Sequence, residues 1–580
     1  MGSWFSGKAA PDRPLFLGSA VNPGGAWYVG NRNSFRPAML PEIDLTDAAS
    51  LPEGALKSFP TPHEGPEVLL VRHEGEVHAF AAHCPHYGAP LAKGQLVNGK
   101  IVCPWHHACF RAKDGSLCEP PALDDLPAFA VREADGRVLV QVPRKPAAST
   151  DNSSATPTAE VGGTPPADTP GAPADARTFV LVGGGAAGQY AAQTLRHEGF
   201  AGKIVLVSAD EKAPYDRTKL SKPYLAGKAK PAALPLREPD FYEKHRIDLQ
   251  LGTRATGLDL ARQELQLAGH PPLRYDQLLL APGGAPNRLP KLPGHELAGV
   301  LPLRTQADAD AILAATKDAK QIVVIGSSFI GMEAASSLVG EGRAVTVVAQ
   351  DKVPFARVLG PEIGAMFRAL HEEKGVHFEP EAEVTALLGE AGRVTGVQLK
   401  TGRVLPADAV VLGVGVRPAT EFLQEAFLLE KDGGLAVDTY LQAAENVYAA
   451  GDVARFPLGA PGVPTRIEHW RVAQQHGRTA ARNMLGQREA FTAAPYFWTQ
   501  QYGKSLRYAG HAEKWDEIIY HGDVAQQDFL ALYVLDGRII AAASMNRDAD
   551  MIHFAERLEQ GQLPALADTH EGMSWAPATN

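Results

Sequence analysis

The sequence has few cysteines, four in 580 residues, and this scarcity limits the chemistry open to the chain. They stand at positions 84, 103, 109 and 118, and no cysteine follows Cys118. The long C-terminal part of the chain therefore has neither a disulfide bond nor a dithiol. Because a reducing cytosol disfavours disulfides, we expect a cytoplasmic protein.

Long apolar runs and an excess of positive charge are also missing. No apolar stretch approaches the roughly 18 residues that a membrane span needs, so no span is expected. The run PLFLGSAV near the N-terminus is too short for a secretory signal. MGSWFS fits the myristoylation pattern at Gly2, but so short a match arises by chance and we prefer an unmodified terminus. The net charge of −10 argues against nucleic acid and anionic membranes as partners.

Two short segments each combine a cysteine with a histidine. Cys84 and His86 are separated by one residue, and Cys103 and His106 by two. Two thiolates and two imidazoles can hold zinc, but zinc sites more often show paired Cys-x-x-Cys knuckles or finger spacing. The observed spacing is typical of a Rieske [2Fe–2S] centre, in which two thiolates bind one iron and two imidazoles bind the other. We therefore predict that these four residues bind a cluster.

Further polar residues lie beside the predicted ligands. His107 directly follows a ligand and could compete with it or act as a hydrogen-bond donor, but we prefer an exposed side chain without a role. Cys109 and Cys118 are predicted to be buried thiols. Ala89 and Trp105 stand where respiratory-chain Rieske proteins carry a disulfide. The region thus resembles the ferredoxin type, at the low end of Rieske potentials.

The composition changes after Val142. Residues 143–176 are rich in Pro, Ala, Ser and Thr and lack aromatic side chains, so we predict a disordered tether. Short β-like runs before it, such as EVLLVRHEGEVHAFAAH and GRVLVQV, predict an antiparallel β domain over 43–142. Residues 1–42 are then an N-terminal extension. A chain of this length is too long for one core, so further domains follow the tether.

A glycine-rich turn opens the part after the tether. An apolar strand at 179–182 runs into Gly183, Gly185 and Gly188, and an alanine-rich helix leads to a second strand at 204–207. Within a βαβ unit this pattern indicates a dinucleotide site. The glycines let the backbone approach a pyrophosphate, and the helix N-terminus offers unpaired N–H groups.

A second copy of this pattern stands at KQIVVIGSSFIGMEAASSLVG, with Gly326, Ser328 and Gly331 in the corresponding places. The serine is tolerable if the phosphate lies slightly further from the backbone. In the first copy, Asp210 and Glu211 follow the second strand and are candidates for binding a ribose. Two such units imply two dinucleotides in one enzyme, and a flavin with a nicotinamide is the usual pair.

From Arg177 onward the sequence resembles the pyridine-nucleotide flavoprotein family, especially reductases of ferredoxin-dependent oxygenases and apoptosis-inducing factor. The segments that carry the resemblance are APYDRTKLSK, YDQLLLAPGGAPNRLP, VVLGVGVRPAT, NVYAAGDVARFP, RIEHW and PYFWTQQYG. With the cysteine–histidine domain in front, the whole chain resembles the Rieske-bearing branch of the apoptosis-inducing factor family.

The resemblance implies roles for individual residues. The first glycine motif would hold the FAD pyrophosphate and the second would hold NAD(P)H. Arg217 and Lys222 would reach the flavin, and Lys222 would pair with Glu333 close to the reactive ring, where a cation stabilises the reduced flavin. Lys222 and Glu333 are therefore the catalytic candidates. The other implied flavin contacts are Asp452, Glu468, His469, Trp470 and Trp498.

Two departures from the family pattern bear on the cofactors. Pro282 stands where relatives often have threonine, which removes an N–H and a hydroxyl from the flavin site. Ala349 stands where a glutamate commonly selects NADH, and Gln350, Asp351 and Lys352 follow it. Asp351 can replace the glutamate and Lys352 can tolerate a 2′-phosphate. We favour NADH.

A missing feature indicates the electron route. Disulfide-reductase flavoproteins carry a cysteine pair after the first glycine motif, and this chain has none there. Electrons from the flavin therefore need a one-electron carrier, and the tethered cluster is one. We predict an oxidoreductase that passes electrons from NAD(P)H through FAD to the cluster and on to a redox partner such as an oxygenase. The alternatives are a redox-responsive signalling protein and a zinc-stabilised binding module fused to a flavoenzyme.

The expected architecture is multidomain. An antiparallel β Rieske domain precedes an α/β flavoprotein of two Rossmann-like domains and a C-terminal α/β domain, which would shield the flavin or form a homodimer. The boundaries are 177–300 and 421–490 for FAD, 301–420 for NAD(P)H and 491–580 for the C-terminal domain.

Overall fold

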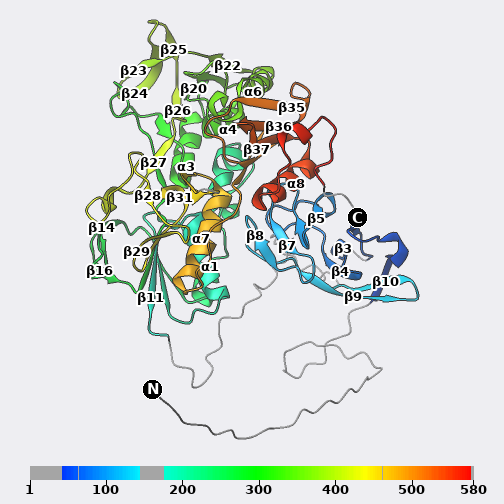
Figure 1. Ribbon diagram of the computed structural model, residues 1–580. Coiled ribbons are helices and arrows are strands. Elements are labelled where there is room, and N and C mark those ends of the chain that lie inside the picture. The colour runs from blue at the N-terminus through cyan, green and yellow to red at the C-terminus, as the bar shows by residue number, and fades with distance from the viewer. Residues whose placement is uncertain (1–41, 63–64, 144–174, 460–461, 577–580) are drawn as a thin grey trace, which may run out of the picture.

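The computed structural model describes residues 42–62, 65–143, 175–459 and 462–576 (Figure 1). The myristoylation motif, almost all of the predicted N-terminal extension and almost all of the predicted tether lie outside these residues. Within the described ranges, no helix is both long and apolar enough to cross a membrane.

Two antiparallel sheets make up the N-terminal domain, blue to cyan in Figure 1. Valines and leucines of β3 (Val68–His73) and valines of β10 (Arg137–Gln141) fill the core of the larger sheet, and alternate residues of β10 point inward. The predicted ligand segments are the turns after β4 (Glu76–Ala81) and between β6 (Lys100–Val102) and β7 (Cys109–Arg111). The larger sheet has the order β1 (Glu42–Asp47), β10 (Arg137–Gln141), β9 (Ala128–Ala134), β4 (Glu76–Ala81), β3 (Val68–His73), β2 (Leu56–Phe59). The smaller sheet has the order β5 (Gln95–Val97), β6 (Lys100–Val102), β7 (Cys109–Arg111), β8 (Leu117–Glu119).

The first Rossmann-like domain is built on a mostly parallel sheet. The central strand β11 has the sequence TFVLV, and four of its five side chains are buried, as expected for a strand covered on both faces. Helices α1 (Ala186–His197) and α7 (Trp470–Met484) lie side by side (Figure 1). They approach closely because Gly477 faces the Ala187 carbonyl, and a Cβ there would come within 2.2 Å of that oxygen. The sheet order is β13 (Ile247–Gln250), β12 (Lys203–Val207), β11 (Thr178–Val182), β17 (Gln277–Leu280), β30 (Val447–Ala449), β29 (Gln442–Ala444).

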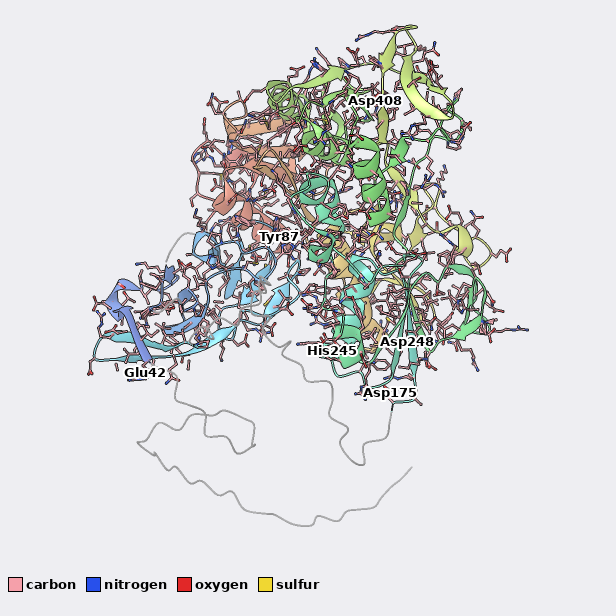
Figure 2. All side chains as sticks on the ribbon, turned by 180° about the vertical axis from the view of Figure 1, so that it is seen from behind. Glu42, Tyr87, Asp175, His245, Asp248 and Asp408 are labelled. Carbon is pink, nitrogen blue, oxygen red and sulfur yellow. The ribbon has the colours of Figure 1, made fainter. Side chains whose placement is uncertain are left out.

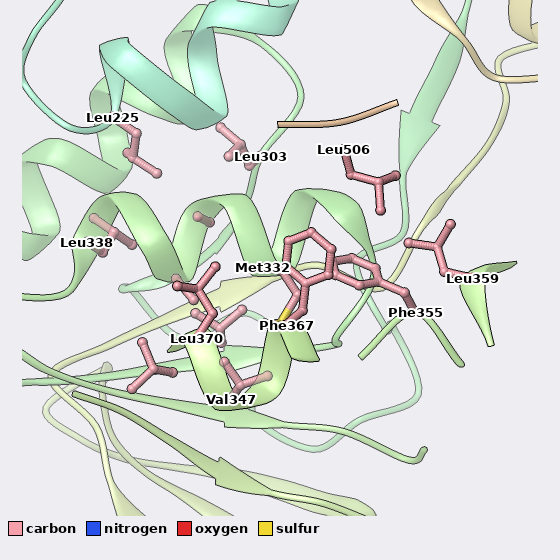
Figure 3. Packing of buried hydrophobic residues seen from close by; sticks show 14 of the residues in the cluster. Leu225, Leu303, Met332, Leu338, Val347, Phe355, Leu359, Phe367, Leu370 and Leu506 are labelled. Atoms are coloured by element: carbon pink, nitrogen blue, oxygen red, sulfur yellow. The ribbon is translucent and has the colours of Figure 1, made fainter. Parts of the chain in front are cut away.

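The second Rossmann-like domain has a five-stranded parallel sheet. Its order is β19 (Val300–Pro302), β26 (Ala409–Leu412), β20 (Gln321–Ile325), β21 (Ala344–Val348), β22 (Val376–Glu379). Three helices cover it: α3 (Gln306–Thr316), α4 (Phe329–Leu338) and α6 (Pro361–Glu373). Met332 of α4 packs against Phe355 and Phe367 in the core (Figure 3). This cluster continues into the C-terminal domain, so the two domains share one core.

The C-terminal domain is an antiparallel sheet with one long helix. The sheet order is β33 (Tyr496–Gln501), β34 (Lys504–Gly510), β37 (Arg538–Met545), β36 (Asp528–Leu535), β35 (Glu517–Asp523). Helix α8 (Asp548–Glu559) lies between this sheet and the N-terminal domain (Figure 1). Its Ile552 is buried with Val97, Val102 and Cys109 of the N-terminal domain.

Smaller elements complete the two Rossmann-like domains. The helices among them are α2 (Phe241–Lys244) and α5 (Ala356–Leu359). The strands are β14 (Ala255–Asp259), β15 (Glu264–Leu267), β16 (His270–Arg274), β18 (Gly284–Pro286), β23 (Val384–Glu390), β24 (Arg393–Leu399), β25 (Val404–Pro406), β27 (Val416–Pro418), β28 (Leu435–Ala436), β31 (Ala454–Leu458), β32 (Val463–Arg466).

Candidate functional site

A cavity of about 1060 Å³ lies where the two Rossmann-like domains meet the C-terminal domain. It extends from the first glycine turn, past the N-terminus of α7, to β33. The predicted residues at the end near the first glycine turn are Gly183, Gly185, Asp210, Arg217, Pro282 and Asp452. Those at its other end are Lys222, Ser328, Glu333, Glu468, His469, Trp470 and Trp498. Gly188, Glu211, Gly326 and Gly331 do not line it.

The first glycine turn leaves room for a ligand above α1. Gly183 has φ +113°, and a Cβ there would lie 2.0 Å from the Ala281 carbonyl oxygen. A Cβ on Gly188 would lie 2.0 Å from the Gly183 carbonyl oxygen, so this glycine allows the helix to pack on the strand. Gly185 precedes α1, and a Cβ there would meet no protein atom within 4 Å. The open space at a helix N-terminus fits the pyrophosphate of FAD.

We expect Gly185→Ala to fold normally but to bind FAD about tenfold to a hundredfold more weakly, which is the cost of overfilling a packed site. The added methyl group touches no protein atom and enters only the space assigned to the cofactor. Titration of apoprotein with FAD, followed by flavin fluorescence, measures the affinity. Equal thermal unfolding of the variant and wild-type apoproteins would show that the fold is intact. Unchanged FAD affinity would contradict the assignment.

Two arginines, Arg217 and Arg304, also line the cavity. Arg304 Nη2 lies 2.5 Å from Asp452 Oδ2, but Arg304 Nε is buried without a hydrogen bond. Burial, followed by the nearby charge of Arg304, lowers the pKa of Arg217, which Asp210 and Asp452 partly offset. The unpartnered donor of Arg304 suits a pyrophosphate oxygen. The sequence-based prediction missed Arg304, although its place just after the parallel strand β19 is where ligand contacts are expected.

Lys222 and Glu333 form an ion pair in the cavity wall. The distance from Lys222 Nζ to Glu333 Oε2 is 2.9 Å, and the Glu333 side chain is only 3% exposed. Ser221 Oγ and Thr499 Oγ1 also donate to this carboxylate, at 2.5 and 2.7 Å. Two donors from the first Rossmann-like domain and one from the C-terminal domain thus fix one buried carboxylate. Their catalytic role stays a prediction.

The second glycine turn has the same construction as the first. Gly326 has φ +107°, and a Cβ there would lie 2.3 Å from the Gly413 carbonyl oxygen. Gly331 faces Gly326 in the same manner. Ser328 Oγ donates to the Gly413 carbonyl at 3.2 Å, so its hydroxyl binds the protein backbone.

The loop after β21 holds the residues that the sequence predicts for the ribose of NAD(P)H. Ala349 is buried at the end of the strand. The Asp351 carboxylate lies 3.2 Å from Arg357 Nη2, an ion pair that sequence analysis did not anticipate. The preference for NADH stays a prediction.

The four predicted cluster ligands converge at one end of the N-terminal domain. The Nδ1 atoms of His86 and His106 are 3.1 Å apart. The thiols of Cys84 and Cys103 are both buried, and each shifts the pKa of the other. Burial lowers the pKa of His86 to about 4, so its ring is in the neutral form that binds metal. Each turn contributes one sulfur and one nitrogen, which fits the donor set of a [2Fe–2S] Rieske centre.

The prediction of an exposed His107 was wrong. The residue is 2% exposed, and its ring stacks on Tyr496 with the centroids 4.8 Å apart. Its Nε2 lies 3.5 Å from Glu556 Oε1 of α8. The C-terminal domain covers this turn, and no local pattern reveals such a contact. Cys109 is buried as predicted, whereas Cys118 is only partly buried.

One indole ring separates the predicted cluster ligands from the cavity. The ring centroids of His106 and Trp498 are 4.3 Å apart, and those of His86 and Trp498 are 6.2 Å apart. Trp498 also lines the cavity described above. Beside these rings, Tyr87 donates a hydrogen bond to Asp216, and it lies where the N-terminal domain meets the rest of the molecule (Figure 2). The ligand turns therefore face the cavity.

Known proteins resemble this chain in all three of its parts. Residues 177–477 match the family model described as pyridine nucleotide-disulphide oxidoreductase, residues 43–130 that of the Rieske [2Fe-2S] domain, and residues 496–572 that of the reductase C-terminal. Apoptosis-inducing factor 3 of Homo sapiens is 38% identical over 500 residues, 86% of this chain and 80% of the relative.

Solved structures of reductases share the fold. A ferredoxin reductase of Rhodopseudomonas palustris has a TM-score of 0.65 at 32% identity, over 67% of this chain and 96% of its own. A chain of the covalent putidaredoxin reductase–putidaredoxin complex has a TM-score of 0.63 at 33% identity, over 66% of this chain and 93% of its own. Both structural matches cover about two thirds of this chain.

Proposed function

Because this chain belongs to the pyridine nucleotide-disulphide oxidoreductase family and carries a Rieske [2Fe–2S] domain in front, we propose that electrons from NAD(P)H leave its flavin through its own cluster. The chain is an NAD(P)H-dependent FAD oxidoreductase of the ferredoxin reductase type. When bound, FAD accepts a hydride from NAD(P)H and releases electrons one at a time, which the cluster can carry.

The contact between His106 and Trp498 is the observation that carries this proposal. A predicted cluster ligand lies 4.3 Å, ring centroid to ring centroid, from a side chain in the wall of the flavin cavity. Electron transfer slows steeply with distance, so a short path through one aromatic ring favours transfer within the chain. Lys222 and Glu333 would set the charge beside the flavin, and the glycine turn with Arg217 and Arg304 would bind its pyrophosphate.

An anaerobic titration of the purified protein with NADH tests the proposal. We expect the flavin absorbance to bleach and a Rieske EPR signal to appear as the cluster becomes reduced. The same titration with NADPH determines the coenzyme preference. A cluster that stays oxidised while the flavin is fully reduced would contradict the proposed route.

The final acceptor is proposed from the names of the relatives. One relative is the ferredoxin–NAD(+) reductase component of a biphenyl dioxygenase system of Paraburkholderia xenovorans, 35% identical over 370 residues. We propose that the acceptor here is likewise an oxygenase or a similar redox protein. The match to the Rieske family model argues against the alternative of a zinc-stabilised binding module. The similarity to apoptosis-inducing factor 3 supports the alternative of a redox-responsive signalling protein. Slow turnover of NADH with a one-electron dye would favour that alternative.

Location and assembly are further proposals. The scarcity of cysteine supports a cytoplasmic location. The C-terminal domain is the part through which the family resemblance would allow a homodimer, and light scattering of the purified protein measures the assembly.

A further inference from the structure

Helix α7 carries a polar stripe along one buried face. The stripe consists of Arg471, Gln474, Gln475 and Arg478, whose spacing of three, four and seven residues places them on the same side of a helix. The first three are at most 1% exposed, and the Arg478 side chain is 14% exposed. Two arginines and two glutamines are costly to bury, so each needs a partner.

All four side chains find partners at the end of β8 of the Rieske domain and in the two residues after it, although one polar atom of each remains buried without a hydrogen bond. Arg471 Nε donates to the Pro120 carbonyl at 2.9 Å, and Gln474 Nε2 donates to the Pro121 carbonyl at 3.3 Å. Gln475 Nε2 donates to Glu119 Oε2 at 2.6 Å. Arg478 donates to both the Cys118 carbonyl and the Glu119 carboxylate. The stripe therefore binds a continuous segment, Cys118–Pro121.

The contact is ionic as well as hydrogen-bonded. Burial alone would raise the pKa of Glu119, but the charges of Arg478 and Arg471 outweigh it and lower the pKa. Buried ion pairs contribute little net stability, because desolvation offsets the attraction. Their geometry is specific, however, and a partner that shifts by one residue would leave a buried charge unpaired. The stripe is thus suited to holding the Rieske domain in one position.

Arginines elsewhere in the flavoprotein bind the Rieske domain in the same manner. Arg507 Nε donates to the Pro104 carbonyl at 2.9 Å, directly beside the second ligand turn. Arg237 donates to the Leu123 carbonyl at 2.7 Å and pairs with Asp124. Such donors recognise main-chain oxygens in loops, whose positions depend on the loop conformation. The contacts therefore extend from the ligand turn to Asp124, past the segment that α7 binds.

The N-terminal end of α7 lies at the flavin cavity. Glu468 and His469 immediately before the helix, and Trp470 at its first position, line that cavity. One rigid helix thus contacts the flavin site at its N-terminus and the Rieske domain along its length.

We propose that the stripe on α7 is a positioning device that holds the Rieske domain in one docked place, with His106 against Trp498. This inference rests on the proposed electron route. The step that it serves is the transfer of one electron from the reduced flavin to the oxidised cluster. NAD(P)H supplies two electrons as a hydride and becomes NAD(P)+, so one turnover takes two such steps, with the cluster reoxidised by the redox partner after each and the flavin proton released to solvent. The transfer occurs within a docked pair, without repeated collisions of a tethered domain.

Substitution of Arg478 tests the device, because this residue touches the Rieske domain and does not line the cavity. Arg478→Met leaves Glu119 with the neutral Gln475 amide at 2.6 Å and a more distant cation, Arg471, at 3.7 Å. We expect the docking equilibrium constant to fall about a hundredfold, as for loss of one partner of a buried pair. Glu119→Gln removes the negative charge of the same ion pair. The matched control is Arg482→Met on the same helix, where Arg482 pairs with Glu198 and Glu489.

Two measurements on the holoprotein test whether docking is weakened. In anaerobic stopped-flow, NADH should reduce the flavin of Arg478→Met and Glu119→Gln at the wild-type rate, while cluster reduction becomes at least about tenfold slower. Hydrogen exchange of the backbone amides around residues 103–119 should increase in both variants and stay unchanged in Arg482→Met. Cluster reduction at the wild-type rate in both variants would overturn the positioning role, whether or not exchange increases. If wild-type flavin never reduces its cluster, the proposed function fails instead, and hydrogen exchange alone still decides whether the stripe holds the domain.

Discussion

His106→Ala abolishes the Rieske EPR signal and the iron bound at that centre, whereas His107→Gln retains both. His106 and His86 present their Nδ1 atoms to the same point, so removal of one imidazole leaves an iron with one nitrogen ligand. His107 points away, toward Glu556 of α8. NADH-driven reduction of an acceptor that depends on the cluster should be lost completely in His106→Ala, with bound FAD unchanged. Iron analysis and EPR on dithionite-reduced protein measure the outcome.

His107→Ala separates a structural role from a ligand role. It leaves Glu556, whose side chain is 4% exposed, with only Lys100 at 3.4 Å. We expect the free energy of unfolding to fall by about 2 kcal/mol, as for a lost hydrogen bond to a charged group, while the EPR signal persists. Loss of the signal in His107→Gln with retention in His106→Ala would show that the ligand assignment is wrong.

Lys222→Met slows the reduction of the flavin by NADH about a hundredfold. The lysine is the cation held against the cavity wall by Glu333. We predict that its removal leaves an unpaired buried carboxylate beside the flavin and withdraws the positive charge that would stabilise the reduced ring, a loss comparable to removing one donor from a charge-stabilising site. Stopped-flow absorbance measures the rate, and spectroelectrochemistry should show a more negative flavin potential.

The controls use nearby residues. Glu333→Gln keeps a side chain that the hydroxyls of Ser221 and Thr499 can still contact, so we expect a smaller effect than for Lys222→Met. Lys228→Met removes an exposed lysine a few residues along the chain and should leave the rate unchanged. If Lys222→Met keeps both the wild-type rate and the wild-type potential, the lysine has no catalytic role.

Local patterns revealed much of the site. A glycine turn between a strand and a helix, or a cysteine two or three residues from a histidine, is contained in a short segment whose spacing reflects the geometry directly. For this reason the two dinucleotide units and the ligand pairs could be predicted from the sequence. The C-terminal domain and its Trp498 were reached only through the family resemblance.

Contacts between distant segments could not be predicted in this way. Arg471 meets Pro120 across 351 positions, and Arg507 meets Pro104 across 403. The burial of His107 depends on a helix near the other end of the chain. The stripe on α7 has a helical period, but polar residues with that spacing usually face solvent. Only the docked Rieske domain explains why these side chains are buried.

Because α7 starts at the flavin cavity and continues along the Rieske domain, FAD binding and domain docking share one element. FAD and the docked Rieske domain both hold that helix in the same place, so the two binding free energies are linked and each favours the other to the same extent. During maturation, a newly made chain that has not yet acquired its flavin would hold its iron–sulfur domain less firmly. The order in which the two prosthetic groups are loaded then affects how long such immature molecules survive proteolysis in the cell.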